Sequence, residues 1–314
     1  MQLLDAAATA AALPWAPLTQ AIADTLADQA AGRVQAPDRW VLPVAPGTSW
    51  FLMPAWITPE AGDLAAIKLI TYSAQNPARG LPAILGDVMV MRASTGERLL
   101  LLDGPTVTAR RTAAATLLAA QRLAPNTAGP LLVIGTGVQA LSHVQALAAG
   151  LGVREVQVIG RTPARAVDFA AELEREAGVQ ARAATDLPTA LADCPLVITA
   201  TPASAVVLSG QVRDDAFVAA IGAFTPQMIE LDPALTRDLA ARGRVVLDSP
   251  AARHEAGDLI AAGLALDGLP TLGDVLAGPA VPPGGAPVLF KSCGAALWDL
   301  AAARCAAASA PQPG

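Results

Sequence analysis

Short apolar runs separated by turn-forming residues dominate the first hundred positions of the chain. The runs cover residues 40–44, 50–56, 64–72, 84–91 and 97–102. They are rich in Val, Ile, Leu and aromatic side chains, and turn residues such as Thr95 and Gly96 lie between them. Such runs are typical of strands in an antiparallel or mixed sheet. A stretch rich in Ala and Leu over residues 106–123, which follows Pro105 and ends before Pro125, predicts a helix.

From residue 129 onward, buried strands alternate with helices. Apolar runs at 131–134, 156–159, 179–182, 196–199, 217–221 and 244–247 predict strands. The intervening segments predict helices through residue 149, over 164–177 and over 187–192. Alternation of this kind indicates a parallel sheet covered on both faces, with right-handed crossovers. Residues 288–305 predict a strand or loop followed by an alanine-rich helix.

The composition adds an expectation about assembly. The 314 residues suffice for one large domain or two ordinary ones, and 53% apolar residues exclude an intrinsically disordered chain. Charged residues make up only 15%, well below the usual quarter or so. A chain with so few charges leaves apolar surface uncovered, so we expect part of it to be buried against a second copy.

Several classes of function are excluded by charge and by segment composition. The net charge is −6 and no run of Lys or Arg occurs, so a nucleic-acid partner is not expected. The uncharged residues 6–23 contain Pro14 and Pro17, are mostly Ala and follow no basic residue. They predict the start of a soluble amphipathic helix, and neither a membrane segment nor a signal peptide.

The cysteines and histidines indicate no metal site. Cys194, Cys293 and Cys305 are odd in number and have no metal-like spacing, and His143 and His254 lie far apart. We interpret the cysteines as reduced packing residues of a cytoplasmic protein.

A glycine-rich turn follows the first strand of the second half and opens a helix. It comprises Gly135, Thr136, Gly137, Val138, Gln139 and Ala140. In the dinucleotide-binding fingerprint the first glycine permits the tight turn and the second lets the backbone approach a pyrophosphate. The third small residue, here Ala140, allows close packing of the helix on the strand. The alternative interpretation is a tight turn that only packs.

The end of the second strand indicates which nicotinamide cofactor binds. An acid there would accept from the adenosine ribose, whereas this chain has Arg161, followed by Thr162 and Arg165. Arg161 can stack on adenine and pair with a 2′-phosphate, and Thr162 can donate a hydrogen bond. These residues predict that NADP(H) is the preferred cofactor, and NAD(H) remains a possible one. The alternative is that Arg161 is a solvated loop residue.

Several further segments occur in an order that resembles a known family. They are Met53-Pro54-Ala55, Lys68, Gly80-Leu81-Pro82, Leu102-Asp103-Gly104, Thr108-Ala109-Arg110-Arg111-Thr112-Ala113-Ala114, the glycine turn, Glu230-Leu231 and Phe290-Lys291-Ser292. Together they resemble the ornithine cyclodeaminase/mu-crystallin family over roughly residues 39–299. The resemblance implies a homodimer with a discontinuous substrate-binding and dimerisation domain, residues 1–107 and 287–314. It also implies an inserted NAD(P)-binding domain, residues 108–286.

The expected fold class is therefore α/β: a Rossmann-type doubly wound parallel sheet plus a discontinuous α+β domain. The resemblance also implies roles for single residues. Arg39, Lys68 and Arg111 match positions that hold the substrate's carboxylate beside the nicotinamide, and Lys68 stands inside an otherwise apolar run. The alternative for Lys68 is a strand residue that points outward. Arg110 is expected to be structural or to face the cofactor. Thr112, Ala200, Thr201, Gly222 and Lys291 complete the predicted cofactor-binding set.

Two departures from the cyclodeaminase pattern indicate the substrate. Phe224 stands where cyclodeaminases of this family carry an aspartate, and a phenyl ring cannot transfer a proton. An acid expected just before Met53 is also missing, because the residues there are Trp50, Phe51 and Leu52. Apolar replacements favour a substrate whose other end is a hydrocarbon ring, and they argue against ornithine.

The leading hypothesis is NAD(P)H-dependent reduction of a cyclic imino acid, because the Gly-Ala-Phe-Thr-Pro loop resembles that of family members with this activity. The expected substrates are Δ1-pyrroline-2-carboxylate, giving L-proline, and Δ1-piperideine-2-carboxylate, giving L-pipecolate. Lys68 and Thr225 are the candidate catalytic residues; Thr225 either hydrogen-bonds the imine nitrogen or is a turn residue before Pro226. The alternatives are an alanine dehydrogenase or open-chain imine reductase, an ornithine cyclodeaminase, and a non-catalytic mu-crystallin-like binding protein.

Overall fold

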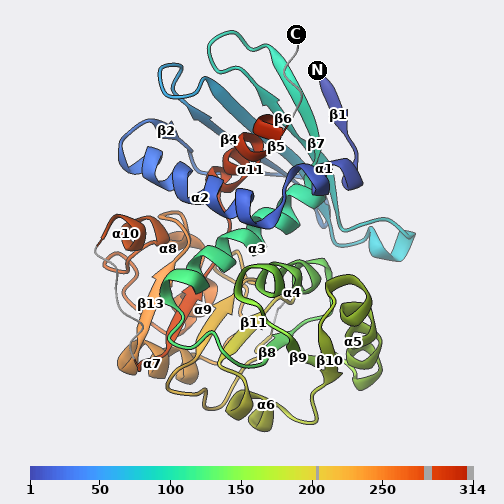
Figure 1. The fold of residues 1–314 in the computed structure, drawn as a ribbon, viewed down its shortest axis with the longest axis vertical. Helices are drawn as coiled ribbons and strands as arrows, with labels where there is room; N and C mark the ends of the chain where they lie inside the picture. Colours follow the sequence, from blue (N-terminus) through green and yellow to red (C-terminus); the bar gives the residue numbers. More distant parts are fainter. Residues whose placement is uncertain (203–204, 279–284, 310–314) are drawn as a thin grey trace. The chain divides into compact units, whose positions relative to one another are not determined.

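The computed structural model describes residues 1–202, 205–278 and 285–309, and the chain divides into two compact units (Figure 1). The first unit comprises Met1–Arg111 and Ala295–Gly314, and the second comprises Thr112–Gly294. The first unit is thus built from both ends of the chain. Its return at residue 295 lies later than the expected 287.

A seven-stranded mixed sheet forms the frame of the first unit. Its main strands are β3 (Trp40–Ala45), β4 (Thr48–Ile57), β5 (Leu64–Ser73), β6 (Ile84–Met91) and β7 (Arg98–Asp103). The order is β1-β7-β6-β5-β4-β2, with β3 also paired to β4. These five strands confirm the five predicted runs. The short β1 (Gln2–Leu4), parallel to β7, and β2 (Val34–Gln35) were not predicted, because two or three residues carry no readable alternation.

The two faces of this sheet have different environments. Along β5, Leu64, Ala66, Lys68 and Ile70 are buried, whereas Ile67 and Leu69 are exposed. The buried face is covered by α11 (Ala296–Ser309), which packs on β4 and β5 and against α2 (Trp15–Ala30). Almost every residue of α11 is buried, and apolar side chains lie on all sides of the helix, with Asp299 as a buried charged exception.

The segment predicted to begin one N-terminal helix contains two helices. The first helix, α1 (Ala6–Ala12), ends before Leu13, and Pro14 is the N-cap of α2. Proline disfavours helical geometry in the residue before it, and Leu13 accordingly has φ −122° and ψ 56°. The prediction of a single helix was wrong at this point.

The second unit is built on a seven-stranded, all-parallel sheet. The strands are β8 (Leu131–Ile134), β9 (Glu155–Ile159), β10 (Gln180–Ala183), β11 (Leu196–Thr199), β12 (Phe217–Ala220), β13 (Arg244–Leu247) and β14 (Val288–Lys291). Their order is β10-β9-β8-β11-β12-β14-β13. From β8 the chain first adds β9 and β10 on one side and then β11 and β12 on the other, so the order of strands reverses between β8 and β11. Doubly wound folds bind their ligands at such a reversal point. The predicted doubly wound domain is confirmed.

Helices connect these strands. The longer ones are α3 (Gly104–Leu123), α4 (Val138–Leu151), α5 (Pro163–Ala177), α6 (Leu187–Asp193) and α7 (Pro233–Arg242). Three short ones follow: α8 (Ala252–Glu255), α9 (Gly257–Ala261) and α10 (Leu272–Ala277). Among the described residues, no helix combines the length and the apolar character that crossing a membrane requires.

The strand β14 corrects the expected domain boundary. It lies between β12 and β13, and all four of its residues are buried. Placing residues 287–294 in the substrate domain was therefore wrong, because β14 completes the second unit's hydrogen-bond ladder before the chain returns to the first unit.

Candidate active site

A cluster of charged side chains lies on the buried side of the first unit's sheet; we call Arg39, Lys68, Arg111 and Asp299 the cationic cluster. Lys68 projects inward from β5 and is 1% exposed, so the outward-pointing alternative does not hold. Its Nζ donates to Asp299 Oδ1 at 3.0 Å. Arg111, on α3, places Nε 3.4 Å from the same Oδ1. Asp299 thus pairs with both Lys68 and Arg111.

The electrostatics of the cluster act on Lys68. Burial is the largest cause that lowers the pKa of Lys68, and the positive charges of Arg111 and Arg39 lower it further. Asp299 opposes both effects, and the result is a pKa of about 7 in place of the usual 10.5. Arg39 lies over the Phe51 ring, with its guanidinium carbon 5.9 Å from the ring centroid. The ammonium is consequently poised to lose or gain a proton near neutral pH.

Asp299 is a site residue that sequence reasoning did not select. It comes from α11, is fully buried and joins Lys68 across 231 positions of the chain. The signal was present, since a single carboxylate in an alanine-rich apolar helix is as unusual as a lysine in an apolar strand. Arg110 has the expected structural role: it donates to Leu13 O at 2.8 Å and lies 3.9 Å over the Trp15 ring.

The glycine turn of the second unit has the geometry of an anion-binding helix start. Gly135 has φ +125°, and a Cβ there would collide with Ala200 O, so only glycine fits. Gly137 is the N-cap of α4, and no side chain caps the helix there. A Cβ at position 137 would contact no atom within 4 Å. Ala140, in the first turn of α4, is fully buried. The amides of Val138 and Gln139 therefore start a helix at an open surface that suits a pyrophosphate.

The end of β9 lies next to this turn. A Cβ on Gly160 would be 3.1 Å from Thr136 Cγ2, which places Arg161 beside the glycine turn. Arg161, Thr162 and Arg165 are all exposed. Thr162 is the N-cap of α5, and its Oγ1 accepts from Arg165 N at 3.3 Å. The second unit thus brings two arginines and a hydroxyl together where a ribose 2′-phosphate is expected.

Four other predicted cofactor residues have different environments. Ala200 and Thr201 follow β11, Gly222 follows β12, and these neighbouring strand ends lie side by side. Thr112 is buried on α3.

Lys291, by contrast, is an internal residue. Its fully buried Nζ lies 2.8 Å from Asp258 Oδ2 and donates to Ala223 O at 2.6 Å. Burial lowers the pKa of Lys291, but its electrostatic interactions with Cys293, Asp258 and Glu230 and its hydrogen bond to Asp258 more than compensate and raise it. Any contribution of Lys291 to cofactor binding is made through the loop that it supports.

The loop after β12 contains the two remaining predicted residues. Phe224 is partly buried and packs against the second unit's hydrophobic core. The carbonyl of Thr225 accepts from Met228 N at 3.1 Å, so Thr225 begins a turn, and a Cβ on Gly257 would clash with that carbonyl.

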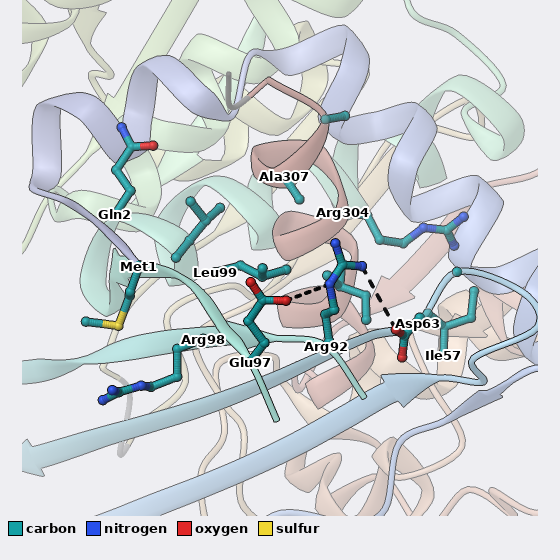
Figure 2. Close-up of a pocket in the computed structure, with 14 residues that line it drawn as sticks. Met1, Gln2, Ile57, Asp63, Arg92, Glu97, Arg98, Leu99, Arg304 and Ala307 are labelled. Carbon is teal, nitrogen blue, oxygen red and sulfur yellow. Dashed lines mark hydrogen bonds and ion pairs between the residues drawn. The ribbon is translucent and has the colours of Figure 1, made fainter. Parts of the chain in front are cut away.

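A cavity of about 750 Å³ in the first unit is separate from these residues (Figure 2). Figure 2 shows Arg92 between Glu97 and Asp63; its Nε is 2.9 Å from Glu97 Oε2. Arg304, which also lines the cavity, pairs with Asp28 at 2.6 Å. None of the described residues that line it belongs to the predicted site, so we do not assign the cavity to the reaction.

In the described part of the chain, no three His, Cys, Asp or Glu side chains gather in a way that could hold a metal ion. The cysteines at 194, 293 and 305 are buried, and none of the three forms a disulfide.

Fold and site together define a two-domain protein of the Rossmann class that pairs a dinucleotide-type turn with a buried cationic cluster. The chain belongs to the ornithine cyclodeaminase/mu-crystallin family, whose sequence model matches residues 3–312. It is 41% identical over 306 residues to Delta(1)-pyrroline-2-carboxylate reductase 1 of Burkholderia multivorans, covering 97% of this chain and 94% of that protein.

Two further relatives agree in length and fold. The Delta(1)-pyrroline-2-carboxylate/Delta(1)-piperideine-2-carboxylate reductase of Azospirillum brasilense is 41% identical over 306 residues, which are 97% of this chain and 94% of the relative. The solved structure of Thermococcus litoralis Delta(1)-pyrroline-2-carboxylate reductase in complex with NADH and L-proline superposes with a TM-score of 0.87. That match has 24% identity and covers 98% of this chain and 96% of the other, so it confirms the fold.

Proposed function

We propose that this protein is an NAD(P)H-dependent reductase that converts Δ1-pyrroline-2-carboxylate to L-proline and Δ1-piperideine-2-carboxylate to L-pipecolate. The observation that carries the proposal is that Lys68 and Arg111 are buried together beside Asp299, with Arg39 close enough to act on the pKa of Lys68. Cationic side chains held together in this way suit an anion as ligand. The carboxylate of an imino acid supplies that anion, and relatives of similar length bear names of reductases for these two substrates.

The chain's own residues position the substrate. Arg111 offers a planar guanidinium that can hold a carboxylate through two hydrogen bonds. Asp299 lies 3.0 Å from Lys68 and 3.4 Å from Arg111, so it fixes both cations in one place. Lys68, with its pKa near 7, is a cation that can pair with the substrate's carboxylate when it is protonated. Orientation of the imine carbon contributes much of the rate acceleration.

The second unit suits a nicotinamide dinucleotide, whose bound form would supply the hydride that reduces the imine carbon. The first turn of α4, which begins after Gly137, would hold the pyrophosphate. We propose NADP(H) as the preferred cofactor and NAD(H) as a weaker one, since Arg161 and Arg165 are exposed beside the glycine turn and no acid occupies that place.

The loop after β12 favours an imine over the alternatives. Cyclodeamination and reductive amination with ammonia both need a group that moves protons on the substrate amine, and Phe224 cannot do so. A preformed cyclic imine takes its nitrogen proton from solvent, and Thr225 can hydrogen-bond that nitrogen in this proposal. Retention of Arg39, Lys68 and Arg111 argues against a carrier without activity.

We propose further that the protein acts as a homodimer through the exposed face of the first unit's sheet. Six large apolar side chains point to that face from β3, β4 and β5: Trp40, Leu42, Trp50, Trp56, Ile67 and Leu69. We call them the apolar sheet face. An exposed patch of this kind marks a protein interface, and a second copy presents the same surface. Buried cysteines without disulfides support the cytoplasm as its compartment.

The proposal is tested by following NADPH and NADH oxidation with four additions: Δ1-pyrroline-2-carboxylate, Δ1-piperideine-2-carboxylate, pyruvate plus ammonia, and buffer alone. We expect turnover with the two cyclic imines and faster turnover with NADPH. Turnover with pyruvate plus ammonia but with neither cyclic imine would show that the protein is an alanine dehydrogenase. No turnover with any addition, together with tight binding of a cyclic imino acid, would favour the carrier.

A further inference from the structure

Glu230 is a fully buried carboxylate that joins two strand ends. Its Oε1 accepts from the amide and the hydroxyl of Thr201, both at 2.8 Å. Its Oε2 accepts from Thr199 Oγ1 at 2.9 Å, Gly222 N at 2.6 Å and Ala223 N at 3.3 Å. The donors belong to the carboxyl ends of β11 and β12, so one side chain links two adjacent strands where both turn into loops.

Close backbone contacts extend this link to the glycine turn. A Cβ on Gly222 would collide with Thr201 O, and a Cβ on Gly135 would collide with Ala200 O. The ends of β8, β11 and β12 are therefore in direct contact.

Glu230 is itself held by a second buried carboxylate. Its amide donates to Asp258 Oδ1 at 2.6 Å, and Asp258 Oδ2 pairs with Lys291 Nζ at 2.8 Å. Lys291 donates in turn to Ala223 O at 2.6 Å. Both the amide and the carbonyl of Ala223 are thus anchored, the first by Glu230 and the second by Lys291.

We propose that Glu230 is a positioning residue for the nicotinamide half of the cofactor. In doubly wound folds the dinucleotide lies across the carboxyl ends of the strands at the reversal point, with one half on each side. Here β8 and β9 carry the glycine turn and Arg161, so the ends of β11 and β12 are left for the nicotinamide half. By fixing Thr201, Gly222 and Ala223, Glu230 keeps that surface in one conformation before the cofactor arrives. The inference rests on the proposed function.

The test is cofactor binding to the full chain carrying Glu230→Gln. An amide places an N–H group against donors that need an acceptor, which removes part of the network while keeping its shape. We expect the Kd of NADPH, measured by calorimetry, to rise about tenfold or more. The Kd of 2′-phospho-ADP-ribose, which lacks nicotinamide, should stay near the wild-type value. NADH and ADP-ribose are measured in parallel, and circular dichroism checks the fold.

A purely structural role would weaken both ligands alike, and that result would overturn the proposal, as would an unchanged NADPH affinity in a folded variant. Thr199→Val is the milder second variant, because Thr199 is fully buried and its Oγ1 donates to Glu230 alone among the bonds described. It should weaken NADPH binding a few fold without affecting 2′-phospho-ADP-ribose, and equal affinities for wild type and variant would contradict the proposal.

Glu155→Gln makes the same chemical change at an exposed position of the same unit and should alter neither affinity. Wild-type protein that binds neither NADPH nor NADH would instead overturn the proposed function and this inference with it. The two failures are therefore distinguishable, since one is seen in the wild type and the other only in the variants.

Discussion

At the scale of single residues, the two lysines show how neighbouring charges set a pKa. The sequence contains only Lys68 and Lys291, and both are buried beside carboxylates. Their environments act in opposite directions: the pKa of Lys68 is lowered to about 7 and that of Lys291 is raised. The difference follows from the neighbours, because Lys68 lies close to two arginines and Lys291 lies close to acidic groups.

The pKa of Lys68 predicts how substrate binding depends on pH. A carboxylate binds the protonated ammonium, so affinity for the imino acid should fall as the pH rises through about 7. With lysine labelled at the side chain with ¹⁵N or ¹³C, NMR should show one signal that titrates near pH 7 and a second, from Lys291, that does not. Adding L-proline should raise the midpoint of the first.

Replacing Lys68 by Met should assign the first signal and raise the KM for the imine about 100-fold, while the Kd of NADPH stays unchanged. A Lys68 signal that titrates only above pH 9 would contradict a lowered pKa for this side chain.

The choice of cofactor is also a residue-scale property. Replacing Arg161 by Ala removes the guanidinium expected to pair with the 2′-phosphate, so kcat/KM for NADPH should fall about 10- to 100-fold while that for NADH changes little. The same change at Arg154, exposed just before β9, is the matched control. An unaltered ratio of NADPH to NADH efficiency would show that Arg161 is only a solvated loop residue.

At the scale of elements, α3 and α4 are joined by a buried histidine. His143 Nδ1 lies 2.7 Å from Gln139 O, a group that only accepts, so Nδ1 carries the proton. The other ring nitrogen then accepts from Thr116 Oγ1 at 3.0 Å. Burial is the main reason why the pKa of His143 falls to about 4, and the bond to Gln139 opposes it. The helix pair is therefore built around a neutral imidazole.

This histidine predicts an acid-sensitive contact. Between pH 6.5 and about 4 the unfolded chain binds a proton that the folded chain does not, so the free energy of unfolding falls as the pH falls through that window. The loss is on the order of 3 kcal/mol at full effect. Denaturant titrations of His143→Gln should show a weaker pH dependence than wild type, whereas His254→Gln, at an exposed position, should not. Identical profiles for wild type and His143→Gln would contradict the assignment.

At the scale of the whole molecule, the two faces of the first unit's sheet differ. One face is buried under α11, and large apolar side chains lie on the other. Such an exposed surface, in a chain with only 15% charged residues, is the basis of the proposed dimer.

The predicted dimer can be tested by one substitution. Leu69→Asp places a charge in the apolar sheet face, where Leu69 is 46% exposed, and should give a monomer by light scattering at micromolar concentration. Val167→Asp on α5, where Val167 is 58% exposed, is the control and should leave the oligomer intact. A wild-type protein that is monomeric at the same concentration would refute the dimer.

The amino-acid sequence by itself determined the features that depend on neighbours in the chain. Short runs of Val, Ile, Leu and aromatic residues between turn residues identified the five long strands of the first unit, and apolar runs identified strands of the parallel sheet. Gly135 marked the turn because its backbone geometry and its contact with Ala200 admit only glycine. Lys68 stood out through its apolar flanks, and the family resemblance gave it a role.

Only the tertiary structure decided which distant residues meet. Asp299 reaches Lys68 across 231 positions, β14 inserts between β12 and β13, and Glu230 collects donors from two strand ends. A local pattern can show that a charge will be buried, because flanking residues report the environment. It does not show which residue pairs with that charge, because the pairing depends on how helices and strands pack in the folded protein.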